Sequence, residues 1–161
     1  MINNLSQFLF QGNQQKQKKR AFISFDYEHD EQLKNALNAQ SKNPDSPFYF
    51  EDWSVKEPFP QNTWRSDVRT KIKQCSFMIV IIGVHTHKAS GVLTEIRIAN
   101  EENLPCFGIY GQRVTFYQNG RYCINVPQGL DKRYIEWTWP NITAAINNLS
   151  QYYPSLTNQY E

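Results

Sequence analysis

One continuous apolar run, followed by a polar loop and a helical pattern, constrains the fold of this chain more than any other feature. Residues 77–82 read Phe-Met-Ile-Val-Ile-Ile and are closed by Gly83. A run of this length is too short for a helix core and is typical of a strand buried on both faces of a parallel sheet. The helix predicted after the loop has an apolar stripe, formed by Val92, Leu93, Ile96 and Ala99.

Glu95 lies on the shoulder of this apolar stripe. It is about 60° from Val92 around the helix axis, because successive helical residues are separated by about 100°. Ligands of open α/β sheets bind outside the carboxyl ends of the strands, where this loop and helix begin. Glu95 is therefore a candidate site residue. The alternative is that it extends to solvent and pairs with Lys88 or Arg97, since one carboxylate alone is weak evidence of a site.

Similar strand and helix patterns precede and follow this unit. Strands are predicted at residues 21–25, 48–50 and 104–110, and helices at residues 28–40 and 62–75. Repeated alternation of strands and helices of this length indicates a parallel sheet covered on both faces. We therefore expect a flavodoxin-like three-layer α/β domain with a mainly parallel sheet.

The pattern changes to a hairpin beyond Gly111. Two runs, residues 114–118 and 121–124, flank Asn119-Gly120, which is the strongest short-range hairpin signal. We expect a two-residue turn with positive φ at both positions. A last strand at residues 134–139 and a closing helix at residues 141–149 complete the predicted domain.

Length and composition set the limits of the domain and exclude several classes of protein. The 161 residues suit one domain, predicted at residues 19–153, with an N-terminal arm at 1–18 and a C-terminal tail at 154–161. A net charge of +2 does not indicate a nucleic-acid-binding protein. No stretch approaches the ~20 apolar residues of a membrane span. The three cysteines lack CxxC spacing and two adjoin apolar runs, so we expect buried thiols and a cytoplasmic location.

The motifs of several enzyme classes are absent from the sequence. The seven glycines form no GxGxxG, no GxxxxGK[ST] and no GxSxG. Redox use of a bound dinucleotide, P-loop phosphoryl transfer and serine hydrolysis therefore lack their usual signatures. His85 and His87 have the spacing of a metal-ligand pair, but no third ligand has a convincing spacing, so we expect no metal.

The predicted strand ends bring polar and aromatic side chains around one crevice. With Glu95, they are Ser24, Phe25, Asp26, Asp52, Trp53, His85 and Thr86. Aromatic rings can stack on a flat heterocycle, while carboxylates and hydroxyls can hold sugar hydroxyls. A single carboxylate suits cleavage of an N-glycosidic bond whose leaving group departs neutral, as nicotinamide does from NAD. Ordinary glycosides require a second carboxyl group to protonate the leaving oxygen.

Several short segments resemble one family. Residues 20–30, Arg-Ala-Phe-Ile-Ser-Phe-Asp-Tyr-Glu-His-Asp, resemble the opening of the TIR-like proteins of bacterial anti-phage defence, the TIR subunits of Thoeris systems. The later segments resemble the same family in the same order: Asp52-Trp53, Ile81-Ile82-Gly83 with Thr86, and Glu95-Ile96. The resemblance covers about residues 19–110. One position departs from the family, which often has a tryptophan four residues before the glutamate, where this chain has Gly91.

The resemblance implies a function and partners for the chain. It implies that Glu95 is the catalytic glutamate and that the loop after the first strand forms part of a nucleotide pocket. The reaction implied is cleavage of NAD, as substrate rather than cofactor, at the nicotinamide–ribose bond. The product would be an ADP-ribose-derived signalling molecule, linear or cyclic. The implied partners are a downstream effector protein that reads the signal, a phage-derived activator and further copies in a homo-oligomer.

Two other functions stay open at this point. One is a non-catalytic TIR interaction module that assembles as an adaptor. The other is an enzyme similar to nucleoside deoxyribosyltransferases, which share the sheet and use a glutamate nucleophile on other N-glycosides.

Overall fold

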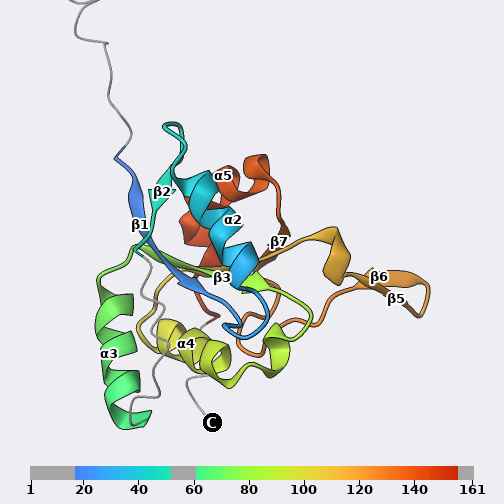
Figure 1. The fold of residues 1–161 in the computed structure, drawn as a ribbon, viewed down its shortest axis with the longest axis horizontal. Helices are drawn as coiled ribbons and strands as arrows, with labels where there is room; N and C mark the ends of the chain where they lie inside the picture. Colours follow the sequence, from blue (N-terminus) through green and yellow to red (C-terminus); the bar gives the residue numbers. More distant parts are fainter. Residues whose placement is uncertain (1–16, 52–60, 156–161) are drawn as a thin grey trace, which may run out of the picture.

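A five-stranded parallel sheet in the order β2-β1-β3-β4-β7 forms the middle layer of the protein (Figure 1). The computed structural model describes residues 17–51 and 61–155. The strands of the sheet are β1 (Lys19–Ser24), β2 (Phe48–Tyr49), β3 (Phe77–Ile82), β4 (Cys106–Tyr110) and β7 (Tyr134–Glu136). This strand order is that of flavodoxin-like folds, with β7 in the place of the fifth strand.

The central strand β3 is buried along its whole length. All six of its side chains are shielded from solvent, as the apolar sequence of residues 77–82 predicts. Successive side chains point to opposite faces of a sheet. Met78, Val80 and Ile82 therefore pack into one apolar cluster. Phe77 and its alternate neighbours Ile79 and Ile81 pack into the other.

Two helices cover each face of the sheet. Helices α3 (Gln61–Lys73) and α4 (Ser90–Glu101) cover the face of Met78, to which they contribute Ile72 and Ile96. Helices α2 (Glu31–Ser41) and α5 (Trp139–Asn147) cover the opposite face with Leu37 and Ile142. Burying one such side chain contributes roughly 1.5–3 kcal/mol, so the apolar stripes hold the helices on the sheet. None of the helices in the described residues is both long and apolar enough to cross a membrane.

The connection from β4 to β7 takes a different form from the others. Residues 111–133, all of them described, form a 3₁₀ turn η2 (Gln112–Val114), a hairpin of β5 (Phe116–Gln118) and β6 (Arg121–Cys123), and a loop. Figure 1 shows the hairpin extending away from the sheet. Leu130 in the loop is fully buried in the cluster beneath α4, where it covers sheet surface that a crossover helix would otherwise cover.

Successive strands are added on opposite sides of β1: β2 lies on one side and β3 on the other. Strands β1 and β3 are neighbours with Ser24 opposite Val80, yet α2 after β1 and α4 after β3 lie on opposite faces. A crevice opens at such a switch point, outside the carboxyl ends of the two strands. A 3₁₀ turn, η1 (Thr86–Lys88), leads from β3 into α4 at this position.

The predicted flavodoxin-like three-layer domain with a hairpin insertion is confirmed. The last strand ends at Glu136 rather than at residue 139, and α5 begins at Trp139 rather than Asn141. The reason is that the Thr138 hydroxyl accepts a hydrogen bond from the Asn141 N–H at 3.2 Å and so caps the helix earlier. Likewise α2 begins at Glu31 rather than at residue 28. Apart from residues 17, 18, 154 and 155, the predicted arm and tail lie outside the described residues.

The hairpin turn has the predicted geometry. Asn119 has a φ of 51° and Gly120 a φ of 78°, both positive, as a two-residue turn between twisted strands requires. The exposed rings of Tyr117 and Tyr122 pack edge to face across the strands, with centroids 5.1 Å apart.

We expect Gly120→Val to destabilise the hairpin and spare the sheet, because a β-branched residue at positive φ is strained. Amide hydrogen exchange should accelerate at residues 116–123 and stay unchanged in β3. Gly111→Val is the matched control, since Gly111 has an ordinary φ of −90° and open space around its missing Cβ. Unchanged exchange in the hairpin of the Gly120 variant would contradict this account of the turn.

Candidate functional site

A cleft of about 520 Å³ lies at the switch point of the sheet, outside the carboxyl end of β1. Its volume falls in the range of about 300–1,000 Å³ that is usual for small-molecule sites. Residues 25–29 after β1 form one wall, and α3 and the first turns of α4 form others. The lining includes five aromatic rings, two histidines and five carboxylates: Phe22, Phe25, Tyr27, Phe50, Trp64, His29, His85, Asp26, Glu28, Glu51, Asp67 and Glu95.

Glu95 reaches this cleft from the second turn of α4. Val92 and Ile96 pack into the apolar cluster on the sheet and fix the rotation of α4 about its axis. Glu95, at the edge of this apolar stripe, therefore faces the end of β1. There the hydroxyl of Ser24, the last residue of β1, donates a hydrogen bond to Glu95 Oε2. Burial raises the pKa of the Glu95 carboxyl to about 7, against the opposing effect of the Ser24 hydrogen bond.

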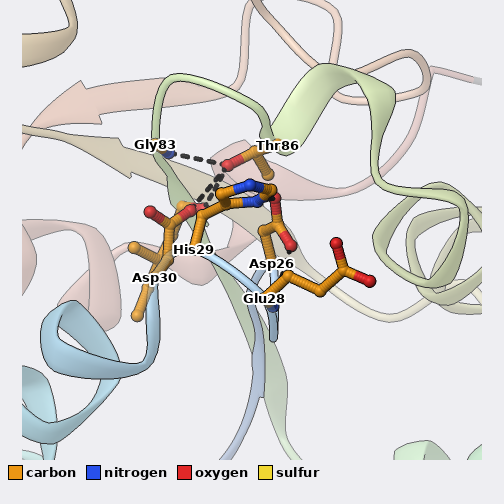
Figure 2. A network of polar contacts seen from close by, with 7 residues as sticks. Asp26, Glu28, His29, Asp30, Gly83 and Thr86 are labelled. Atoms are coloured by element: carbon orange, nitrogen blue, oxygen red, sulfur yellow. Dashed lines mark hydrogen bonds and ion pairs between the residues drawn. The ribbon is translucent and has the colours of Figure 1, made fainter.

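A second cluster of polar residues, in the loop after β1, also lines the cleft (Figure 2). Asp26 is only 7% exposed, and both of its carboxylate oxygens have partners. Oδ1 accepts a hydrogen bond from the Glu28 N–H at 3.1 Å, and Oδ2 lies 2.7 Å from His29 Nδ1. The hydrogen bond to Asp26 raises the pKa of His29 above its usual value. The His29 ring also packs against that of His85, with centroids 4.3 Å apart.

A third cluster of polar residues lies behind the cleft and connects the loop after β3 to the start of α2 through hydrogen bonds. The Thr86 hydroxyl accepts a hydrogen bond from the Gly83 N–H at 2.7 Å and donates one to Asp30 Oδ2 at 3.1 Å (Figure 2). A Cβ on Gly83 would clash with both carboxylate oxygens of Asp30, so only glycine leaves room for this carboxyl group. Burial raises the pKa of Asp30, and the Thr86 hydrogen bond opposes that rise.

The structure brings four of the predicted site residues together in the cleft. They are Phe25, Asp26, His85 and Glu95. Ser24 and Thr86 are fully buried and do not line the cleft, so their hydroxyls reach Glu95 and Asp30 instead. Asp52 and Trp53 lie outside the described residues. Substrate binding stays a prediction for all of the residues predicted to do so: Ser24, Phe25, Asp26, Asp52, Trp53, His85 and Thr86.

Several residues that line the cleft are not predicted from the sequence. His29 is the most informative, because a carboxylate holds its ring. Lys34 is buried on α2, with its ammonium nitrogen 5.7 Å from the centroid of the Phe25 ring. Trp64 comes from α3, which the sequence marks only as an amphipathic helix. The charged Glu-His-Asp segment after the first strand was the available signal for His29 and Asp30.

Three further observations describe the cleft and the surroundings of Glu95. Nothing lies within 4 Å of the position of a Cβ on Gly91, so the cleft is open at this side. Within residues 17–51 and 61–155, no three His, Cys, Asp or Glu side chains gather as a metal site would require. In the same part of the chain, Glu95 forms its hydrogen bond with Ser24 and no ion pair with Lys88 or Arg97.

Comparison with known proteins places the chain beside one family. The family model described as "Thoeris protein ThsB, TIR-like domain" matches residues 22–115, which is more than half of the chain. No curated protein matches.

Two solved structures show a distant likeness. The TIR domains in "Structure of the activated Roq1 resistosome directly recognizing the pathogen effector XopQ" are 15% identical, with a TM-score of 0.43 over 59% of this chain and 58% of that chain. A prokaryotic SEFIR domain is 18% identical, with a TM-score of 0.47 over 83% of this chain and 91% of that chain. This chain thus spans less than two thirds of the first of these structures.

The raised pKa of Glu95 predicts how stability changes with pH. Between the usual value of 4.5 and about 7, the folded protein binds this proton more tightly than the unfolded chain does. The contribution of Glu95 to stability therefore falls as the pH rises through this interval. Glu95→Gln removes the titration, so the melting temperature of the variant relative to the parent should rise between about pH 5 and pH 8. A difference that is constant across this range, or that falls, would show that Glu95 is not a buried carboxyl group.

Proposed function

The chain belongs to the family of TIR-like domains of the Thoeris protein ThsB, and on this premise we propose that it cleaves NAD at the bond between nicotinamide and ribose. The observation that carries the proposal is the position of Glu95. A partly buried carboxylate projects into a cleft of ligand size at the switch point of the sheet, where flavodoxin-like folds bind their ligands.

The chemistry of the reaction matches a site with one such carboxylate. When the bond breaks, its electron pair passes to the positively charged pyridinium nitrogen, and nicotinamide leaves as a neutral molecule. No proton has to be delivered to the leaving group. Positive charge develops on the ribose ring, where the carboxylate of Glu95 would stabilise it. Such an interaction is stronger in a partly desolvated cleft than in water.

Glu95 can stabilise the positive charge on the ribose only when its carboxyl group is ionised. With a pKa of about 7, a large part of the carboxyl groups is protonated at neutral pH in the free protein. The Ser24 hydrogen bond favours the charged form. The positive charge on the pyridinium ring of bound NAD would favour it further, because an opposite charge nearby lowers the pKa of a carboxyl group.

Other groups in the cleft suit other parts of NAD. The rings of Phe25, Phe50 and Trp64 offer apolar surface for the flat nicotinamide or adenine ring. Lys34 and Lys88 offer positive charge for the pyrophosphate.

The family supports two extensions of the proposal. The first is that the product is an ADP-ribose-derived signalling molecule, linear or cyclic, that a downstream effector protein recognises. The second is that a phage-derived component activates the enzyme. An adaptor that acts only by assembly would need no desolvated carboxylate in a cleft. We therefore favour catalysis over the interaction module.

We predict that Glu95→Gln lowers nicotinamide release from NAD by roughly two to three powers of ten, because electrostatic groups of this kind contribute about 3–4 kcal/mol. Gln keeps the shape and most of the hydrogen bonding but removes the charge. The measurement is nicotinamide release per folded molecule, with NAD and infected-cell lysate as activator. Glu101→Gln is the matched control, since Glu101 lies on the same helix with an exposed carboxylate paired to Arg69.

The same assay separates the alternatives. Undiminished turnover in a folded Glu95→Gln variant would remove Glu95 from the mechanism. Absence of nicotinamide release by the parent in activating lysate would favour the interaction module. Cleavage of nucleosides in preference to NAD would favour the deoxyribosyltransferase-like reaction. Mass analysis of the product identifies the ADP-ribose derivative.

A further inference from the structure

The Asp26–His29 pair forms a second chemical centre in the cleft, on a different element from Glu95. Asp26 and His29 follow β1, whereas Glu95 lies on α4. Both residues of the pair line the cleft. The reaction proposed for Glu95 leaves one proton transfer unassigned, and the geometry of this pair suits that step.

The carboxylate of Asp26 holds the ring of His29 in one orientation. Asp26 is itself held by the Glu28 N–H at 3.1 Å, and its Oδ2 lies 2.7 Å from His29 Nδ1. A neutral imidazole has one N–H and one free lone pair. Since the carboxylate accepts the proton on Nδ1, the lone pair of the neutral ring is on Nε2. The ring of His85, 4.3 Å away, limits rotation from the other side.

The imidazole of His29 remains accessible while its partner is buried. The side chain of His29 is 46% exposed, and that of Asp26 is 9% exposed. This is the arrangement of a general base, in which an oriented ring faces the reactants and a buried carboxylate stabilises the imidazolium formed. Among the two histidines that line the cleft, His29 is the one bonded to a carboxylate within the described residues.

The charged groups around His29 also favour its uptake of a proton. The hydrogen bond to Asp26 has the largest effect, and the charges of Asp26, Glu28 and Asp30 act in the same direction. Burial of the ring opposes them. The other titratable group that faces the ring is His85. The pKa of His29 is therefore above its ordinary value.

Capture of the ADP-ribosyl group requires such a base. After the bond from C1′ to the nicotinamide nitrogen has broken, an acceptor hydroxyl forms a new bond from its oxygen to C1′. The acceptor is water in hydrolysis, or a hydroxyl of the ADP-ribose itself in cyclisation. Its oxygen must then lose a proton.

We propose that His29 is the general base that takes this proton on Nε2, and that Asp26 is the positioning residue that holds it. This inference rests on the proposed NAD cleavage. Glu95 stabilises the positive charge on the ribose, and His29 activates the acceptor. The proton passes from the acceptor oxygen to His29 and then to solvent, so the histidine returns to its neutral form in each cycle. Two titratable groups in different surroundings thus have different roles.

The test compares His29→Gln with His87→Gln, a matched change at a histidine that does not line the cleft. Loss of a general base costs roughly 10²–10⁴-fold in rate, so nicotinamide release by His29→Gln should fall by at least about a hundredfold. Sodium azide should restore it, because azide forms a bond to C1′ without losing a proton. The rescued product is ADP-ribosyl azide, which is identified by mass. Azide should not rescue Glu95→Gln.

The outcomes separate this inference from the proposed function. A parent that releases no nicotinamide in activating lysate overturns both. An active parent with undiminished turnover in His29→Gln overturns the role of His29 alone. A His29→Gln variant that is folded and inactive, but not rescued by azide, also overturns it, since the defect then lies in bond cleavage or binding.

A second measurement tests the pair without any turnover. Asp26→Asn removes the negative charge and should lower the pKa of His29, as measured by NMR titration of the labelled imidazole. The amide group that this change introduces can also donate a hydrogen bond to Nδ1, which would move the ring proton to Nε2 and remove the base. An unchanged pKa of His29 in a folded Asp26→Asn protein would show that Asp26 does not hold the ring and would overturn the positioning role.

Discussion

The complete burial of β3 is the constraint on which the rest of the site depends. Six apolar side chains in a row can be shielded only if both faces of the strand are covered. The strand therefore lies in the middle of the sheet, with β1 on one side and β4 on the other. The loop and helix that follow it must begin at the carboxyl edge. This placement brings Glu95 on α4 to Ser24 at the end of β1.

The site contains two carboxyl groups, those of Glu95 and Asp30, whose ionised forms are disfavoured by burial. The pKa values of Glu95 and Asp30 are both raised by burial, which means that their ionised forms reduce the stability of the fold. Hydrogen bonds from Ser24 and Thr86 offset part of this effect. The position of Gly83 leaves room for Asp30 where any other residue would clash. A chain selected only for stability would replace such groups with apolar ones, so their presence at the switch point fits a functional role.

The sequence predicts the elements of this fold better than it predicts the site. The range of β3 and the turn at Asn119-Gly120 agree with the structure, because both depend on local patterns of hydrophobicity and backbone preference. The inward lean of Glu95 follows from helical periodicity. The Asp26–His29 pair and the Gly83–Thr86–Asp30 group cannot be predicted from a local pattern. They depend on the register of β1 against β3 and on how the loops fold back. The side chains of Thr86 and Ser24 are buried and hydrogen-bond to carboxylates, a placement that the sequence does not reveal, and their contact with substrate stays a prediction.

The proposed cleavage of NAD depends on the ionised carboxylate of Glu95. The most direct measurement is the pH dependence of kcat/KM for nicotinamide release by the activated parent, which reports the pKa values of the free enzyme. We predict that kcat/KM, measured with azide as the acceptor so that His29 is not required as a base, rises with pH through a group with a pKa of about 7, and that this step is absent from the residual activity of Glu95→Gln. A profile in which kcat/KM falls as the pH rises through this region, or in which the same step persists in Glu95→Gln, would contradict it.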